Sequence, residues 1–263
     1  MAFTPSELRN LGNLVRRRVQ SARVRPRVPD GERIYAVGDI HGRADLLERL
    51  HRTIEEDASS QPDMRVKVVY LGDYIDRGHD SKAVLDLLVE QPLAGVTNIY
   101  LKGNHEDAFL RFLEDKSNGP RWFAIGGNAT ALSYGVRIPS TLPPSERLDH
   151  VWRELHERIC EAHLDFLWSL QLAFRAGDYF FAHAGIKPGR PLDEQHPLDL
   201  MWIRGEFLRS RKDHRVIVVH GHSPKPSVDV RPNRIGIDTL AYATNVLTCL
   251  VLEGDTRRFL STS

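Results

Sequence analysis

The sequence predicts an α/β fold with parallel strands, and three observations support this prediction. A short apolar strand, a polar loop and a helix follow one another three times between residues 33 and 113. This order is typical of βαβ units, whose strands run parallel with right-handed crossovers. Each polar loop falls at the carboxyl end of its strand, where open α/β sheets bind their ligands. The 263 residues suffice for one large domain of this class.

Short apolar runs mark the expected strands in chain order. Three of them precede polar loops, and four more give the C-terminal third a β-rich character. The seven runs are Ile34–Val37, Val66–Leu71, Val96–Leu101, Tyr179–Phe181, Val216–Val219, Arg234–Ile237 and Val246–Leu252.

Helices are expected between these strands. Leu46, Leu47 and Leu50 share one face of a predicted helix over Ala44–Asp57. The other helices are expected over Ser81–Val89, after Glu106 to about Leu113, and as a hairpin over Leu148–Leu170. The glycines from Gly126 to Gly135 predict a turn-rich loop.

Residues 1–30 are predicted to form a basic arm, and residues 31–263 a single-domain body. Seven arginines against two acids give the arm a net charge of 7 − 2 = +5. Thr4-Pro5-Ser6-Glu7 has the form of a capping box, and the apolar spacing after it predicts a short amphipathic helix ending near Ser21. We expect this helix to pack on the body or to stay solvated. An anchor for an acidic partner or an anionic membrane, and a targeting peptide, are the alternatives.

The overall composition excludes several classes of protein. A net charge of +1, from 36 Lys+Arg and 35 Asp+Glu, differs from the strongly basic body of a nucleic-acid binder. No apolar run reaches the ~18–20 residues that a transmembrane helix needs. The only cysteines, Cys160 and Cys249, cannot form a disulfide framework and are expected to be small buried side chains. They predict a reducing compartment, the cytoplasm.

Side chains that can bind metal ions fall at the ends of five predicted strands, and glycine neighbours five of the six. These are Asp39, His41, Asp73, Asn104, His183 and His222. Carboxylate, imidazole and amide ligands without thiolate suit zinc, iron or manganese. A carboxylate shared between two ions could hold them ~3.5–4 Å apart, a separation that suits in-line displacement at phosphorus.

Three segments resemble the phosphoesterase motifs of the phosphoprotein phosphatase family, in the form found in its bacterial and phage-like serine/threonine phosphatases. They are Gly38-Asp39-Ile40-His41-Gly42, Gly72-Asp73-Tyr74-Ile75-Asp76-Arg77-Gly78 and Gly103-Asn104-His105-Glu106. The resemblance continues through His183-Ala184-Gly185, Met201-Trp202-Ile203-Arg204 and Gly221-His222-Ser223-Pro224. It implies the four-layer architecture of a calcineurin-like metallophosphoesterase, with a central β-sandwich flanked by helices.

The resemblance also implies two divalent metal ions, with manganese expected and iron or zinc as alternatives. By similarity, one ion takes Asp39, His41 and Asp73. The other takes Asp73, Asn104, His183 and His222, so that Asp73 bridges the pair. A water between the two ions would supply hydroxide as the nucleophile, and the phosphoryl group would pass directly to water.

Four further residues receive roles by the same similarity. Arg77 and Arg204 resemble the phosphate clamp, because a guanidinium can hold two phosphoryl oxygens at once. His105 resembles the general acid that protonates the leaving alkoxide, and Asp76 the carboxylate that orients it. A structural pairing of Arg77 with Asp76 is the alternative for that arginine.

The expected function is therefore the hydrolysis of phosphoserine and phosphothreonine in proteins, or of another phosphorylated substrate. A symmetrical diadenosine tetraphosphate hydrolase is the alternative, and residues 116–170 are expected to decide between them by forming the substrate rim. Trp122, Tyr134 and Arg137 are candidates there for stacking adenine. A nuclease is disfavoured because Pro224 stands where such enzymes carry a final histidine, and an inactive scaffold because all six candidate ligands are present. From Leu240 to Asn245 the chain has no glycine, whereas members of this family are commonly glycine-rich there, so a rim of different shape is expected.

Overall fold

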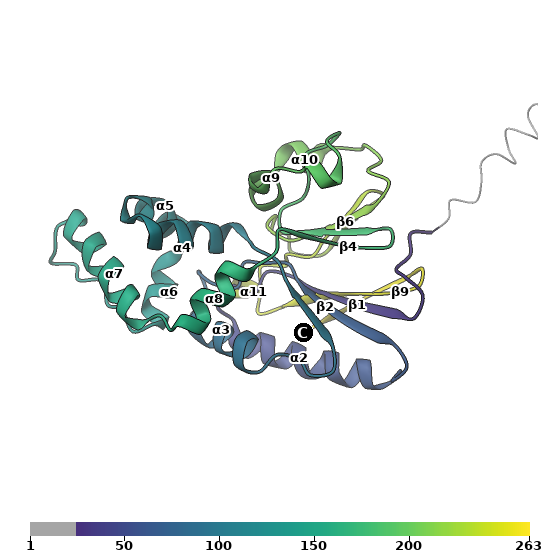
Figure 1. Cartoon of the computed structure of the whole chain (residues 1–263), viewed down its shortest axis with the longest axis horizontal. Coiled ribbons are helices and arrows are strands. Elements are labelled where there is room, and N and C mark those ends of the chain that lie inside the picture. Colours follow the sequence, from purple (N-terminus) through teal and green to yellow (C-terminus); the bar gives the residue numbers. More distant parts are fainter. Residues whose placement is uncertain (1–24) are drawn as a thin grey trace, which may run out of the picture.

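Two five-stranded sheets lie face to face, with helices on the outer surface of each (Figure 1). The computed structural model of the chain describes residues 25–263. A further group of helices, α4 to α8, gathers at one end of the sheets (Figure 1). The expected four-layer arrangement of helix, sheet, sheet and helix is confirmed.

The first sheet has the strand order β10-β9-β1-β2-β3. Strands β1, β2 and β3 are parallel, as the βαβ pattern predicts. Strand β9 is antiparallel to β1, and the edge strand β10 is antiparallel to β9. The bounds are Glu32–Val37 for β1, Arg65–Tyr70 for β2, Thr97–Tyr100 for β3, Thr248–Glu253 for β9 and Thr256–Ser261 for β10.

The second sheet has the strand order β4-β5-β6-β8-β7. Strands β5, β6 and β8 are parallel, and the edge strands β4 and β7 are antiparallel to their neighbours. The bounds are Ala173–Ala176 for β4, Tyr179–Ala182 for β5, Ile217–His220 for β6, Asp229–Arg231 for β7 and Arg234–Gly236 for β8. Each sheet thus has three parallel strands whose carboxyl ends carry loops.

The helices fall into three groups by position. Helices α2 and α3 follow β1 and β2 and lie on the first sheet, whereas α9 and α10 lie on the second (Figure 1). Their bounds are Ala44–Ser59, Ser81–Glu90, Pro197–Trp202 and Gly205–Arg209. The end group is Asn104–Glu114 for α4, Gly119–Ala124 for α5, Gly127–Ser133 for α6, Pro144–Arg158 for α7 and Glu161–Ser169 for α8. The last helix, α11, is the single turn Ala241–Thr244.

Alternation along the strands divides the apolar core into layers, because successive side chains point to opposite faces. On β1, Ile34 and Ala36 join the cluster between the sheets, whereas Tyr35 and Val37 join the cluster under α2 and α3. On β5, Phe181 faces the first sheet and Phe180 faces α9 and α10. A strand that is buried on both faces has a continuous apolar sequence. The apolar runs therefore predicted these strands.

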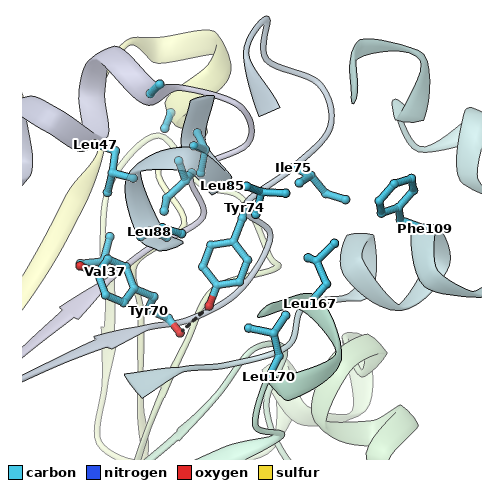
Figure 2. Packing of buried hydrophobic residues seen from close by; sticks show 14 of the residues in the cluster. Val37, Leu47, Tyr70, Tyr74, Ile75, Leu85, Leu88, Phe109, Leu167 and Leu170 are labelled. Carbon is cyan, nitrogen blue, oxygen red and sulfur yellow. Dashed lines mark hydrogen bonds between the residues drawn. The ribbon is translucent and has the colours of Figure 1, made fainter. Parts of the chain in front are cut away.

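Tyr74 connects the loop after β2 to the core beneath it. Its side chain is fully buried among Ile75, Leu85 and Leu88, and its hydroxyl donates a hydrogen bond to the carbonyl of Tyr70 at 3.4 Å (Figure 2). The hydroxyl also donates to the Leu101 carbonyl at 2.8 Å. The backbone of this functional loop is therefore fixed by burial directly under it.

Two sequence-based expectations are wrong in detail. The segment from Gly126 to Gly135 contains helix α6 rather than a turn-rich loop. Gly127 lies against the Trp122 ring, where a Cβ atom would overlap the indole, so close packing rather than turning requires that glycine. Cys160 is exposed at the start of α8, whereas Cys249 is buried in β9 as expected.

The predicted amphipathic helix of the basic arm lies outside the described residues. The end of the arm is attached to the body, since Val28 is buried and its amide donates to the Gly254 carbonyl at 3.0 Å. Among residues 25–263, no helix combines the length and the apolar character that a membrane crossing requires.

One buried histidine on α2 predicts a pH dependence of stability. The His51 Nε2 lies 2.9 Å from the Tyr70 hydroxyl, and burial lowers the pKa of His51 to about 4. The unfolded chain, with a histidine pKa of about 6.5, binds the proton first as the pH falls, so acid favours unfolding. We expect this residue to account for a loss of about 2 kcal/mol between about pH 7 and about pH 5.

Urea unfolding of the wild type and of His51→Gln at both pH values measures this loss. The variant should lose less stability than the wild type over the interval, whereas His79→Gln, at an exposed position, should not differ from it. An identical pH response of the wild type and His51→Gln would contradict the assignment.

Candidate active site

Polar loops from both sheets meet at one edge of the sandwich and bring the candidate residues together. Asp39 and His41 follow β1, Asp73 follows β2, and Asn104 begins the helix after β3. His183 follows β5 and His222 follows β6. All six side chains are at most 3% exposed. The structure therefore gathers every predicted metal ligand in one buried cluster.

Unusual backbone conformations aim these side chains. His41, Asp73, Asp76, Arg77 and His222 all have φ between 47° and 69°, in the left-handed region that non-glycine residues seldom adopt. Such strain persists where the surrounding structure enforces it, and it is typical of functional sites.

Two glycines allow the loops to cross at close range. A Cβ atom at Gly103 would overlap Asp73 Oδ1, and one at Gly221 would overlap Asp39 Oδ1. Any larger residue at these positions would displace a candidate ligand. The glycines that border the motifs are thus required by the approach of one loop to the next.

Asp73 lies at the centre of the cluster and is shared by two groups of possible metal ligands. One group is His41, Asp73 and His105, and the other is Asp73, His183 and His222. Asp73 Oδ2 lies 3.5 Å from His41 Nε2, and Asp73 Oδ1 lies 3.2 Å from His183 Nε2. One carboxylate with an oxygen toward each side has the geometry of a bridging ligand.

Two ligands predicted by similarity lie beside these groups. Asn104 Oδ1 lies 3.0 Å from His183 Nε2 and 2.6 Å from His222 Nδ1, within the second group. Asp39 Oδ2 accepts a hydrogen bond from the His222 amide at 2.9 Å, while its Oδ1 is buried without a hydrogen-bond partner among residues 25–263. A buried carboxylate oxygen without a partner is costly, and a cation there would satisfy it.

The imidazoles are neutral, which is the form that binds metal ions. Burial, with His105 nearby, lowers the pKa of His41 to about 3, and burial with His183 nearby lowers that of His222 to about 2. Burial also lowers the pKa of His183. The ring nitrogen of His41 that faces away from Asp73 lies 2.9 Å from the Ile75 carbonyl, which orients the ring. The donor set therefore fits two divalent cations.

His105 differs from the other histidines because two carboxylates surround it. Burial alone would lower its pKa, but Asp73 and the hydrogen-bonded Asp76 raise it above the ordinary value. Its Nδ1 lies 2.8 Å from Asp76 Oδ2, and its Nε2 is buried without a hydrogen-bond partner in the described part of the chain. The two carboxylates therefore favour the protonated form of the ring, which has one nitrogen anchored and the other directed into the cluster.

The Asp76 carboxylate is fixed by the helical group at the end of the sheets. The Trp122 indole donates to it at 3.1 Å, and the Thr130 hydroxyl donates at 2.6 Å. Thus α5 and α6 hold the carboxylate that anchors His105.

The two predicted phosphate-binding arginines lie at the margin of the cluster. Arg77 is half-buried, its side chain makes no ion pair with Asp76 among the described residues, and Asp76 pairs with His105 instead. Arg204 is exposed and its Nε donates to His222 Nε2 at 2.9 Å. The structural alternative for Arg77 is therefore wrong, and Arg204 contacts the cluster directly through His222.

Two residues beside the site were missed in the sequence. Asp238 follows β8, is buried, and has its pKa raised to about 6 by burial. The rule that ligands gather at carboxyl ends of strands could have found it. Tyr242, on α11, lies 5.2 Å beneath the Arg77 guanidinium and 5.4 Å from the His41 ring. Nothing in the sequence pattern signals that contact.

Of the three residues expected to stack adenine, Arg137 is exposed, but the two aromatic ones cannot do so. Trp122 is fully buried and Tyr134 is 6% exposed, so neither offers a face to a ligand. The aromatic side chains near the margin are instead Tyr242 and Trp202, and Trp202 lies 4.4 Å beneath the Arg121 guanidinium. Neither Tyr242 nor Trp202 was predicted to stack on a substrate.

Comparisons with known proteins give relatives with two activities. The family described as calcineurin-like phosphoesterase matches residues 32–250. The asymmetrical bis(5'-nucleosyl)-tetraphosphatase PrpE of Oceanobacillus iheyensis is 26% identical, over 82% of this chain and 87% of its own. Serine/threonine-protein phosphatase 1 of Salmonella typhimurium is 28% identical, over 68% of this chain and 71% of its own. The symmetrical bis(5'-nucleosyl)-tetraphosphatase of an Acidovorax species is 30% identical, over 82% of this chain and 64% of its own.

The fold also matches a solved structure. A candidate diadenosine tetraphosphatase superimposes with a TM-score of 0.54, covering 91% of this chain and 95% of its own at 22% identity. That likeness concerns the arrangement of the chain in space.

Removing the shared carboxylate is expected to abolish binding of the metal pair. In Asp73→Asn, the manganese retained after desalting should fall from about two ions per chain to about one or fewer, because both ligand groups lose a charged oxygen. Elemental analysis of the purified proteins measures this. Asp86→Asn, which removes a carboxylate paired with Lys82 on α3, should retain the wild-type amount. Equal metal content in the wild type and Asp73→Asn would contradict a bridging role.

Proposed function

The chain belongs to the calcineurin-like phosphoesterase family, and on that premise we propose that it hydrolyses phosphoserine and phosphothreonine in proteins. The observation that carries the proposal is the position of His105, which is anchored on Asp76 through Nδ1 at 2.8 Å and directs Nε2 into the cluster. An alkoxide of serine or threonine is a poor leaving group and needs a proton as it departs. A similarity to serine/threonine-protein phosphatase 1 supports this substrate class.

Different residues of the chain would bind the metal ions, bind the phosphate and transfer the proton. Asp39, His41, Asp73, Asn104, His183 and His222 would hold two divalent ions, proposed to be manganese. These ions, when bound, supply a nucleophile from water at neutral pH and neutralise phosphate charge.

Arg77 and Arg204 would bind the non-bridging oxygens of the phosphoryl group and turn its leaving oxygen toward His105. Tyr242 supports the Arg77 guanidinium from below, and its hydroxyl accepts a hydrogen bond from that group at 3.4 Å. The supported guanidinium retains donors for the phosphate, because a guanidinium has five.

Proton transfer would run through His105 alone. Its Nε2 donates the proton to the leaving alkoxide, while Asp76 Oδ2 accepts from Nδ1 and stabilises the charged ring before transfer. Because Trp122 and Thr130 fix Asp76, the ring cannot rotate away from the reacting oxygen.

A dinucleoside tetraphosphate hydrolase is the second candidate, and the positions of two guanidinium–aromatic stacks favour it. Arg77 lies over Tyr242 beside His41, whereas Arg121 lies over Trp202, whose ring centre is 6.4 Å from that of His222. Guanidinium and indole faces can stack on nucleobases. Relatives named as bis(5'-nucleosyl)-tetraphosphatases add support.

Phosphate release from a phosphothreonine peptide, with diadenosine tetraphosphate as the parallel substrate and manganese present, tests the proposal. Turnover of the peptide with little of the dinucleotide is the expected result. Cleavage of the dinucleotide alone would replace the proposal with the second candidate, and nucleotide chromatography would then separate a symmetrical cut (two ADP) from an asymmetrical one (ATP and AMP).

A matched pair of substrates tests the role of His105. In His105→Asn, hydrolysis of the phosphothreonine peptide should fall by ~100-fold or more, because its alkoxide departs without a proton. Hydrolysis of p-nitrophenyl phosphate should fall far less, since its phenolate leaves unaided. His79→Asn, at an exposed position of the loop after β2, serves as the control. Equal losses on the two substrates would be inconsistent with a general acid.

A further inference from the structure

A basic pocket separate from the metal centre lies beside α10. Its volume is about 540 Å³, within the ~300–1,000 Å³ of small-molecule sites. It is formed by residues 186–192 after β5 and residues 212–215 before β6. None of the candidate metal ligands or phosphate-binding arginines lines it. We propose that this pocket binds a nucleotide-sized organic phosphate.

Positive charge without partners is the first argument. Arg190, Lys212 and Arg215 line the pocket against a single acid, Asp213. Among residues 25–263, neither the Lys212 ammonium nor the Arg215 guanidinium forms an ion pair, and Arg190 pairs with Asp199 only at 3.4 Å. Ammonium and guanidinium groups gathered around one hollow attract a group with several negative charges.

The walls are fixed by hydrogen bonds, so the pocket is preformed. On one side, Gln195 accepts from the Lys187 amide at 2.7 Å and donates to the Arg190 carbonyl at 2.9 Å. On the other side, Asn233 donates to the carbonyls of Ser210 and Lys212 at 3.0 and 2.9 Å. Preformed walls reduce the entropy that a ligand must overcome to bind.

The two walls approach each other at a glycine. A Cβ atom at Gly189 would lie 2.8 Å from Lys212 Nζ, so the ammonium reaches across to the opposite loop. Arg215 has φ 60°, a left-handed conformation that turns the chain at this point of the wall. Both features place cations from separate segments around one space.

Apolar groups form the rest of the pocket and fix the class of ligand. Ile186, Pro191 and Leu192 line it together with His214, whose pKa is lowered by burial, so that its ring is uncharged at neutral pH. An inorganic phosphate would use only the cations. A ligand with a flat organic body as well as phosphates would use both halves, and a nucleotide has that composition.

The pocket lies behind the loop that carries His183. Ile186, in its floor, follows His183 by three residues, and Gly185 contacts the ring of Phe207. The Phe207 ring centre is 6.2 Å from that of His214. Phe207 therefore lies between the pocket and the loop that carries His183, and no side chain is shared by the pocket and the candidate metal ligands.

Titration calorimetry with ADP tests the proposal on the manganese-loaded protein. In the double variant Lys212→Gln/Arg215→Gln, the affinity of the pocket for ADP should fall by about tenfold or more, because two charged hydrogen-bond donors are lost. Arg209→Gln/Arg211→Gln removes the same net charge from residues next to the pocket that do not line it, and should bind as the wild type does. Equal weakening in both double variants would mean general attraction by charge and would overturn the proposal.

Photolabelling places the ligand independently of affinity. With 8-azido-ADP, the labelled peptides of the wild type should include residues 186–192 or 212–215, and labelling only at the metal-centre loops would overturn the proposal. Inorganic phosphate should bind the pocket more weakly than ADP, and equal affinity would exclude use of the apolar floor. Hydrolysis of p-nitrophenyl phosphate by Lys212→Gln/Arg215→Gln should match the wild type, so failure of this inference is distinguishable from failure of the proposed hydrolytic function.

Discussion

One buried carboxylate holds the site together. Glu106 is fully buried, and its oxygens accept hydrogen bonds from the amides of Asp73 and Tyr74 at 2.9 and 2.8 Å and of Gly103 at 2.9 Å. It thereby ties the loop after β2 to the loop after β3. Burial raises the pKa of Glu106 to about 7, because a carboxylate removed from water loses its hydration. The strained position of Asp73 between two sets of histidines depends on these bonds.

The pairing of two sheets explains why one edge of the sandwich can hold so many ligands. Each sheet has three parallel strands, and their carboxyl ends open toward the same edge. The first sheet supplies Asp39 and Asp73, whereas the second supplies His183 and His222. A ligand placed there is surrounded from both sides, which a single open sheet cannot achieve without additional domains.

Local pattern predicted much of this arrangement, and long-range contacts explain the remainder. Strands such as β1 and the residues at their carboxyl ends are apparent in the sequence because burial on both faces and the following polar loop are local features. The position of Tyr242 is not apparent in the sequence, because it depends on Arg43 from the other end of the chain. The Arg43 guanidinium donates hydrogen bonds to the Ala241 carbonyl and to Asn245, on either side of Tyr242. The glycines of α6 suggested a turn because glycine is common in turns, whereas Gly127 is required by its packing on the Trp122 ring five residues earlier.

The left-handed residues of the site have a consequence for folding. Five of them in the ligand loops oppose the intrinsic preference of the chain, at roughly 1–2 kcal/mol each, so these loops cannot assume their geometry before both sheets have formed. The unfolded chain then offers a cation scattered donors only. A cation that binds the finished site removes native molecules from the unfolding equilibrium and stabilises them by mass action. Metal supply would thus contribute to the equilibrium stability of the folded protein in addition to its chemistry.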